Sequence, residues 1–120
     1  MQASSLIIRL ARELRTTLDQ RFAAFGLTSQ QAGLLIHVFT GQTSPKMLAD
    51  LLGTDTAAIT RLVDRLEGKA LVAREPDVGD RRAIVVRLTE TGRALIPELP
   101  PTVEAVGAEW TRGQTAQEGA

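Results

Sequence analysis

The 120-residue sequence has no cysteine and a single histidine, His37. Without cysteine the chain can form neither disulfides nor thiolate metal sites, which agrees with a cytoplasmic protein. Only carboxylates remain as a set of metal ligands, so we expect no metal. The sequence also offers no nucleophile–base set and no glycine-rich phosphate loop. We therefore expect no enzymatic activity and no cofactor.

Long apolar runs and an excess of one charge are also missing. No apolar run approaches about 18 residues, so the sequence predicts no membrane span. Arg9, Arg12 and Arg15 interrupt the hydrophobic residues near the N-terminus, which is unlike a signal peptide. The net charge is +0 and the sequence pI is about 6.6, well below a typical basic DNA-binding domain. The charge balance permits nucleic-acid binding without demanding it, and the length predicts one small domain.

The most informative part of the sequence is residues 48–66, in which two helical patterns meet at Gly53. Gly53 can adopt the left-handed conformation that ends a helix, and the small Ala49 lets two helices cross closely. The expected inward faces are Leu48, Leu51 and Leu52 in the first helix and Ile59, Leu62, Val63 and Leu66 in the second. This spacing predicts a helix-turn-helix, although an ordinary helical hairpin in a protein core has the same pattern.

The second of these helices, expected over about residues 54–68, has a polar face opposite its apolar stripe. On a helical wheel, Ala57, Thr60, Arg61 and Asp64 lie on that face. Small, hydroxyl and guanidinium side chains on an exposed helix suit the major groove of DNA.

Two short runs rich in β-branched residues follow, at residues 71–75 and 83–88, with a polar loop between them. This pattern predicts a β-hairpin. We expect the second strand to alternate, with Ile84, Val86 and Leu88 on one face and Ala83, Val85 and Arg87 on the other. A helix-turn-helix followed by a hairpin with arginines near its tip is a winged helix, whose wing can place a cation in the minor groove.

Helical patterns flank this motif on both sides. Residues 4–26 predict a long helix, which packs either on another subunit or in the core of its own subunit. A capping box that starts at Thr28 predicts the next helix, and Ser44 followed by Pro45 predicts the start of the one after it. Thr89 is expected to cap the helix that follows the wing.

Prolines and glycines shape the end of the chain. The last helix, expected over residues 90–112, must kink or restart at its three prolines, Pro97, Pro100 and Pro101. Residues 113–120 contain two glycines and no large apolar side chain, and we expect them to form a disordered tail.

Three motifs give the chain a resemblance to a known family. They are Thr-Arg-Leu-Val-Asp-Arg-Leu-Glu at residues 60–67, Lys-Ala-Leu-Val at residues 69–72, and Asp80-x-Arg82 followed by Val86-x-Leu88-Thr89-x-x-Gly92. The chain resembles the MarR family of multiple-antibiotic-resistance-type regulators over residues 3–112. One departure is Ala70, where the family usually has a glycine that ends the recognition helix. Ala70 must either avoid a positive φ angle or accept modest strain.

The resemblance implies a mainly α fold with a small β-hairpin, in which dimerisation helices flank a winged helix-turn-helix. A single domain would span residues 1–112, with the N-terminal dimerisation helix at 4–26, the winged helix-turn-helix at 28–93, and a kinked helix at 90–112 directed toward the dimer interface. Family members usually continue into a final helix that interlocks with the partner subunit. We expect this chain to lack that helix, which puts the implied homodimer in question.

The implied function is a sequence-specific regulator of transcription, in most cases a repressor, that binds a palindromic double-stranded DNA operator. Candidate DNA-contacting residues are Thr54, Thr56, Ala57, Thr60, Arg61 and Arg65 in the recognition helix, and Asp80, Arg81 and Arg82 in the wing at residues 76–82. Arg61 is our first choice for reading a guanine, and the less favoured alternative is a solvated surface arginine paired with Asp64. The resemblance implies that Arg82 enters the minor groove, and we expect Asp80 to orient it.

Relatives often bind small aromatic or anionic effectors between the dimer helices and the winged helix. Arg9, Arg12 and His37 are our candidates for such a site, although His37 also fits a partly buried structural side chain. Two other functions stay open. The winged helix could be a protein-interaction module, or the chain could be a truncated subunit that pairs with a full-length relative without binding an operator by itself.

Overall fold

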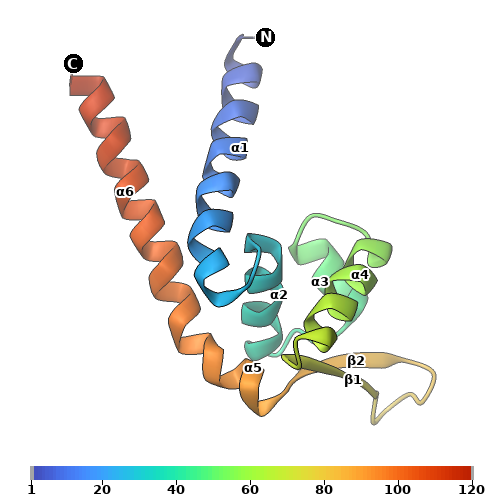
Figure 1. Ribbon diagram of the computed structural model, residues 1–120. Helices are drawn as coiled ribbons and strands as arrows, with labels where there is room; N and C mark the ends of the chain where they lie inside the picture. Colours follow the sequence, from blue (N-terminus) through green and yellow to red (C-terminus); the bar gives the residue numbers. More distant parts are fainter. Residues whose placement is uncertain (1, 120) are drawn as a thin grey trace. The chain divides into compact units, whose positions relative to one another are not determined.

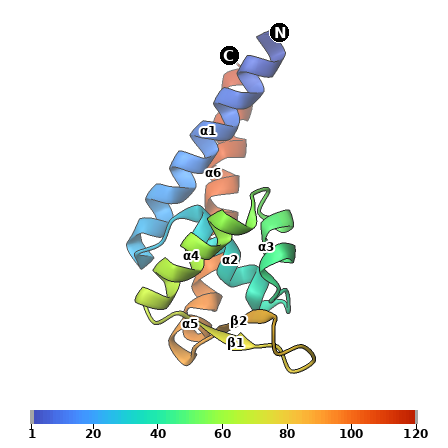
Figure 2. The same cartoon turned by 90° about the vertical axis from the view of Figure 1, so that its right-hand side faces the viewer.

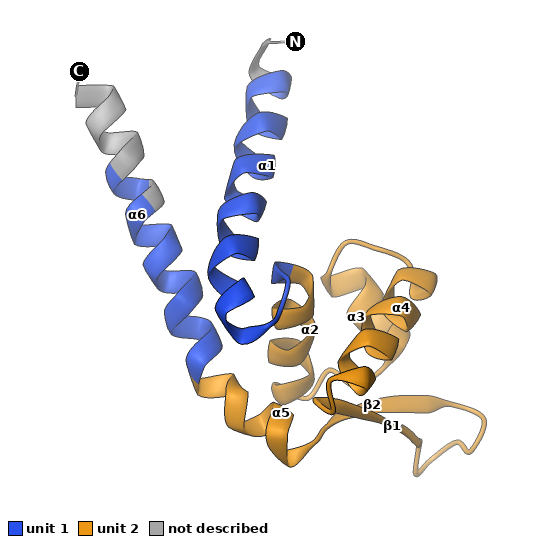
Figure 3. Ribbon diagram, in the orientation of Figure 1, with its two compact units in different colours: residues 1–29, 98–120 blue, residues 30–97 orange. Residues whose placement is uncertain are grey.

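A computed structural model of the chain describes the backbone of residues 2–119 and the side chains of residues 4–109, 111 and 112. The chain divides into two compact units, which Figure 3 colours separately. One unit consists of Met1–Ser29 and Glu98–Ala120, and the other of Gln30–Pro97. In the part of the chain that is described, none of the helices combines the length and the hydropathy that a membrane crossing needs.

The first unit is built on two long helices, α1 (Gln2–Phe22) and α6 (Leu99–Gly119), which approach each other at the end of α1 and diverge toward the two termini in Figure 1, and which Figure 2 shows from a second side. Phe22, Leu99 and Val106 are fully buried, and an ion pair joins Arg21 of α1 to Glu109 of α6. The short helix η1 (Ala23–Phe25) follows α1 and ends at Gly26, whose φ is 72°. The short helix η2 (Ile96–Glu98) precedes α6.

The end of α6 differs from the sequence prediction. We expected residues 113–120 to form a disordered tail, whereas α6 runs to Gly119. Extending a formed helix adds one hydrogen bond for each residue that is fixed, so weak helix formers can be included once the helix is nucleated. The side chains of residues 113–120 lie outside the described set.

The second unit contains the helix-turn-helix and the wing. Its elements in chain order are α2 (Ser29–Phe39), α3 (Pro45–Leu51), α4 (Thr56–Gly68), β1 (Val72–Pro76), β2 (Ile84–Leu88) and α5 (Glu90–Leu95). The two strands pair antiparallel, with Val72 opposite Leu88 at one end and Pro76 opposite Ile84 at the other. The core consists of Leu34, Leu35, Leu48, Ile59, Val63, Leu66 and Val86, which are all at most 2% exposed. The fold prediction of a mainly helical chain with one hairpin is confirmed.

Local signals in the sequence set the helix boundaries correctly in several places. Ser44 Oγ accepts the Met47 N–H, and Pro45 is the first residue of α3. Thr89 Oγ1 accepts the Gly92 N–H at the start of α5. Gly53 has a φ of 66° after the end of α3, as its position predicted.

One assignment of an inward face was wrong. Leu51 is 45% exposed, because α3 turns Leu48 and Ala49 toward the core instead. In β2, Ile84 is 51% exposed while Val85 and Val86 are both buried. The outer edge of β2 is also covered, since the Val86 N–H donates to Thr43 O at 2.9 Å. The burial of both Val85 and Val86 does not contradict the predicted alternation, because successive side chains of a strand point to opposite faces, and both faces can be covered.

Candidate nucleic-acid interface

Helix α4 begins one residue after its cap, Asp55. The Asp55 carboxylate accepts the Ala58 N–H at 2.8 Å, and the backbone of Asp55 is extended. The prediction that the helix starts at about residue 54 was therefore slightly wrong, and Thr54 lies outside the helix. An aspartate at this position stabilises the helix by satisfying an unpaired N–H and by facing the positive end of the helix dipole.

One side of α4 is exposed and carries the residues that we predicted to face DNA. Thr56, Ala57, Thr60, Arg61 and Arg65 are all exposed. The Thr60 hydroxyl donates to Thr56 O at 3.0 Å, which fixes its orientation along the helix. Ile59, Leu62, Val63 and Leu66 are buried on the other side, so the predicted division of α4 into an apolar and a polar face is confirmed.

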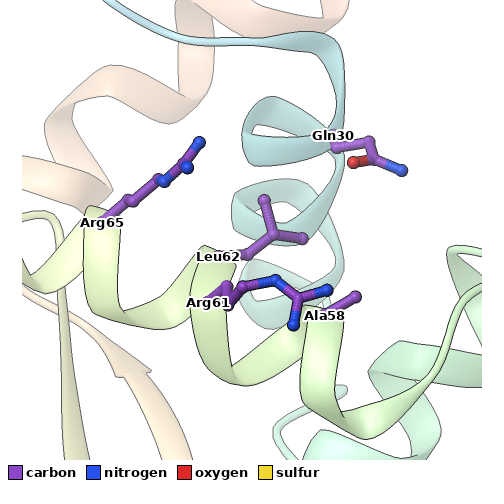
Figure 4. A pocket seen from close by; sticks show the side chains of 5 residues that line it. All are labelled: Gln30, Ala58, Arg61, Leu62 and Arg65. Atoms are coloured by element: carbon purple, nitrogen blue, oxygen red, sulfur yellow. The ribbon is translucent and has the colours of Figure 1, made fainter.

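Arg61 and Arg65 line a small pocket of about 150 Å³ between α4 and α2. Its other walls are Gln30 of α2 and Ala58 and Leu62 of α4. Figure 4 shows both guanidinium groups extended from α4, with Leu62 directed toward α2. Among the residues with described side chains, neither arginine has an ion-pair partner. Both cations are thus available to a negatively charged ligand.

Asp64 pairs with Arg74 of β1 and not with Arg61. Arg74 Nη2 lies 2.8 Å from Asp64 Oδ1. The alternative pairing of Arg61 with Asp64 is therefore wrong, and the reading of a base by Arg61 stays a prediction.

Arg74 makes further bonds to α4. Its Nη2 also donates to the Thr60 carbonyl at 3.1 Å, and its Nη1 pairs with the carboxylate of Glu67. The Arg74 backbone N–H donates to the second Glu67 oxygen at 3.3 Å. Our sequence analysis gave Arg74 no role. In the sequence, Arg74 could have been noticed only as an arginine on a strand that follows two acidic residues of a helix.

The wing loop is shaped by its aspartates. Asp80 Oδ1 accepts the Arg82 N–H at 3.0 Å, and Asp80 O accepts the Ala83 N–H at 3.0 Å. Asp77 closes the loop through its own N–H, which donates to Ala83 O at 2.9 Å. Asp80 thus fixes the backbone that carries Arg82. Arg81 and Arg82 are exposed, and no other described side chain forms an ion pair with either of them.

The Leu-Thr-x-x-Gly motif attaches α5 to the segment that follows α4. Thr89 Oγ1 donates to Ala70 O at 2.6 Å, and the Thr89 N–H donates to Leu71 O at 3.1 Å. Gly92 lies so close to this segment that a Cβ atom would be 2.1 Å from Leu71 O. The close packing of α5 against the segment after α4 therefore requires Thr89 and Gly92 at this spacing.

Ala70, where the family usually has a glycine, adopts a φ of 60°. Of the two outcomes that we considered for this residue, the structure has the strained one, because a Cβ atom disfavours left-handed backbone. On the preceding residue, Lys69 Nζ donates to the buried Gln31 Oε1 at 3.0 Å and connects the end of α4 to α2.

The three candidate effector residues lie in different compact units. Arg9 and Arg12 are exposed on α1, and Arg12 lines a shallow pocket formed by Glu13, Thr16, Thr17 and Gln20 of the same helix. His37 is half-buried on α2 in the other unit. The effector site stays a prediction. Within the described residues, no three histidine, aspartate or glutamate side chains are grouped to hold a metal ion.

Comparison with known proteins agrees with this architecture. A family model described as MarR family matches residues 25–83, from the end of η1 through the wing loop. The chain is similar to the reduced form of MarR from E. coli, with 28% identity and a TM-score of 0.82 over 96% of this chain and 86% of that chain. It is also similar to a mutant of E. coli MarR complexed with operator DNA, with 26% identity and a TM-score of 0.85 over 94% of this chain and 82% of that one.

A third similar structure contains a small-molecule ligand. It is CouR from Rhodococcus jostii RHA1 bound to p-coumaroyl-CoA, with 25% identity and a TM-score of 0.81 over 95% of this chain and 82% of that chain. The family model covers the helix-turn-helix and most of the wing, and the structural matches extend over almost the whole chain. With its winged helix-turn-helix, its wing motif and these matches, the chain belongs to the MarR family of winged-helix transcriptional regulators.

Proposed function

We propose that the protein is a sequence-specific double-stranded DNA-binding repressor, in which α4 enters the major groove and the wing lies at the minor groove. The observation that carries this proposal is the set of unpaired cations on the second unit. Arg61 and Arg65 on α4 and Arg81 and Arg82 on the wing are exposed, and none of them has an ion-pair partner among the described residues. The similarity to a MarR structure that contains operator DNA supports the same function.

Each candidate residue has a specific role in the proposal. Arg61 reads a guanine, because a guanidinium can donate to O6 and N7 together. Ala57 and the Thr60 methyl group contact thymine methyls or sugars, and the hydroxyls of Thr54 and Thr56 bind phosphates near the start of α4. Arg65 contacts the DNA backbone.

The wing completes the interface with a different kind of contact. Arg82 enters the minor groove, where the narrow walls concentrate negative potential. Arg81 contacts the phosphate backbone beside it. Asp80 does not contact DNA in this proposal, since its carboxylate holds the backbone of Arg82 in place.

Specific binding requires two such heads, so the proposal includes a homodimer. Leu6, Ile7 and Ile8 of α1 and Val103 of α6 belong to the first unit and are all more than 40% exposed. These apolar side chains would be covered by a second copy of the chain. A dimer binds two half-sites about one helical turn of DNA apart, which accounts for a palindromic operator. Light scattering of the purified chain tests the dimer, and Ile7→Glu should shift the measured mass toward that of a monomer.

The DNA test starts from a pool of random 30-base-pair duplexes, from which the wild-type protein selects its own site. Fluorescence anisotropy then gives the Kd for the selected duplex and for random DNA. Arg61→Ala should weaken binding to the selected duplex by about 1–3 kcal/mol and relax the preference at one base pair. Arg82→Ala should weaken binding to all sequences and reduce the slope of log K against log salt by about one unit.

The matched control is Arg112→Ala, which removes the same charge from an exposed position on α6 in the other unit. It should leave DNA affinity nearly unchanged. If wild-type protein does not prefer any duplex over random DNA, the proposal that the chain acts as a repressor without another partner protein is wrong. The protein-interaction module or the truncated partner subunit would then account for the winged helix.

The proposal also includes a response to a small aromatic or anionic ligand, in line with CouR, whose structure contains p-coumaroyl-CoA. Arg9, Arg12 and His37 are the residues that we assign to it. Adding p-coumaroyl-CoA or simple aromatic carboxylates to the anisotropy assay should release the duplex from wild-type protein. An Arg9→Ala, Arg12→Ala double variant should bind the duplex but resist release.

A further inference from the structure

Arg74 connects the wing strand to the recognition helix at three positions of α4. Thr60, Asp64 and Glu67 follow the i, i+4, i+7 spacing that places side chains along one stripe of a helix. Arg74 donates to the carbonyl of the first and pairs with the carboxylates of the other two. The two most distant partners in sequence, Arg74 and Thr60, are 14 residues apart.

This stripe separates the buried face of α4 from its exposed arginines. The buried face consists of Ile59, Leu62, Val63 and Leu66, and the opposite side presents Arg61 and Arg65. Asp64 is adjacent to Arg65 in sequence, and its side chain is 61% exposed even when paired. Two carboxylates are therefore held at the border of the surface that we assign to DNA.

The contact with Arg74 changes the net charge around α4. Within Thr56–Gly68 two arginines and two acids give a net charge of zero, so a net positive charge on this helix requires a cation from another element. Arg74 supplies that cation from β1, and its side chain is only 28% exposed. The guanidinium lies against α4, where its bonds to three helix residues hold it, instead of extending into solvent.

We infer that Arg74 is a positioning residue for DNA recognition. It fixes the orientation of α4 relative to the wing strand and offsets the charge of Asp64 and Glu67, so that α4 presents a net positive face. Arg74 does not contact DNA itself. This inference rests on the proposed function, and it deepens that function by coupling the two parts of the interface into one rigid body.

The experiment compares Arg74→Met with Arg87→Met, its matched control. Arg87 lies on β2 of the same hairpin, and its half-exposed side chain is 3.6 Å from Glu75. Each variant removes one positive charge from the hairpin. Arg74→Met breaks two ion pairs, and Arg87→Met breaks one. Arg74→Met should weaken binding to the selected duplex by roughly tenfold or more, since two carboxylates then face the phosphates without compensation. Arg87→Met should change the affinity by no more than about threefold.

A double-mutant cycle separates positioning from net charge. Asp64→Asn and Glu67→Gln are introduced together into wild type, into Arg74→Met and into Arg87→Met. We expect the neutral pair to restore most of the affinity lost in Arg74→Met, with a coupling of at least fivefold. The same pair should show no coupling with Arg87→Met, although the net charges are identical.

The salt dependence gives a second readout. Arg74→Met should keep the wild-type slope, whereas Arg82→Ala loses about one unit, because only a cation that lies against the DNA releases a counterion on binding. Should Arg74→Met misfold by circular dichroism, Arg74→Lys keeps the charge but cannot bridge three groups, and it should show at least half of the logarithmic loss in affinity.

The outcomes distinguish the inference from the function on which it rests. If wild-type protein binds no duplex, the proposed function fails and the inference fails with it. If wild type binds but Arg74→Met behaves like Arg87→Met, or shows no coupling to the neutral pair, only the inference is overturned. A slope reduced by one unit in Arg74→Met would make Arg74 a direct phosphate contact, which also overturns it.

Discussion

Replacing Gly92 by alanine should strongly destabilise the fold, although it adds only a methyl group. A Cβ atom built on Gly92 would lie 2.1 Å from Leu71 O, while ordinary contact starts at 3.4 Å. The two backbones must therefore separate by more than about 1 Å. The obstructing atom is a backbone carbonyl, which cannot rotate away as a flexible side chain could.

The cost follows from what holds Leu71 O in place. It accepts the Thr89 N–H at 3.1 Å, while Thr89 Oγ1 donates to Ala70 O at 2.6 Å. Separating the segments weakens these bonds, which contribute about 1 kcal/mol each, and steric strain adds about 1–3 kcal/mol. We expect a loss of about 2–4 kcal/mol in the free energy of unfolding. For a chain of this length, that lowers Tm by roughly 10 °C or more.

Thermal unfolding monitored by circular dichroism measures this effect, and Gly107→Ala is the matched control. Gly107 lies within α6, and a Cβ atom there would meet no heavy atom within 4 Å. Alanine at this position should raise stability by about 0.5–1 kcal/mol through better helix propensity. A Tm of Gly92→Ala within about 2 °C of wild type would refute the reasoning, because the close approach of α5 to Leu71 would then not exist in solution.

Two further substitutions test the ends of α4. Ala70→Gly should raise the free energy of unfolding by about 0.5–1 kcal/mol, because glycine adopts the observed φ of 60° without strain; a decrease in urea unfolding experiments would show that this strain is absent. Asp55→Ala should lower stability by about 1 kcal/mol, because the Ala58 N–H loses its acceptor; Asp55→Ser is the control that keeps the cap, and equal losses in both variants would exclude a capping role.

The parts of the fold that the sequence predicted correctly depend on near neighbours. Ser44 and Thr89 cap helices through N–H groups three residues ahead, and Gly53 ends α3 through its own φ angle. The apolar stripe of α4 follows from its spacing alone. Interactions over three or four residues are visible in sequence because the local conformation nearly fixes their geometry.

The errors arise where distant segments decide burial. Val85 and Val86 are adjacent on β2 and are both buried, whereas Ile84 is exposed. Alternation along the strand predicts which side chains share a face, but it cannot show which faces other segments cover. Leu51 is exposed, whereas Leu48 and Ala49 of the same seven-residue helix are buried. The apolar character of these residues alone cannot predict which of two adjacent faces of a short helix is buried.

Arg74 was missed for a related reason. Its pairing with Asp64 and Glu67 depends on how β1 leaves the end of α4, and that path runs through Ala70 with its positive φ. A glycine at residue 70 would have indicated a positive φ and therefore this turn, whereas alanine does not. Arg61 and Arg65 needed no such information, because their place on the exposed face of α4 follows from helical spacing.

The near-zero net charge of the chain, its weakest feature as a DNA-binding protein, has a different meaning once the partners are known. Between residues 54 and 93 there are eight basic and seven acidic residues, which nearly cancel. The acids are not equivalent to the bases, since six of the seven have structural partners, whereas the arginines of the proposed interface have no ion-pair partner among the described residues. Glu75 pairs with Arg87, and Asp77 accepts the Gly79 N–H. Asp55 caps α4, Asp64 and Glu67 are paired with Arg74, and Asp80 holds the wing loop. Affinity for DNA depends on the cations that reach phosphates, and not on the total charge of the chain. A neutral composition is therefore compatible with the proposed interface, because Arg74 offsets the charges of Asp64 and Glu67, while Arg61 and Arg65 have no ion-pair partner among the described residues.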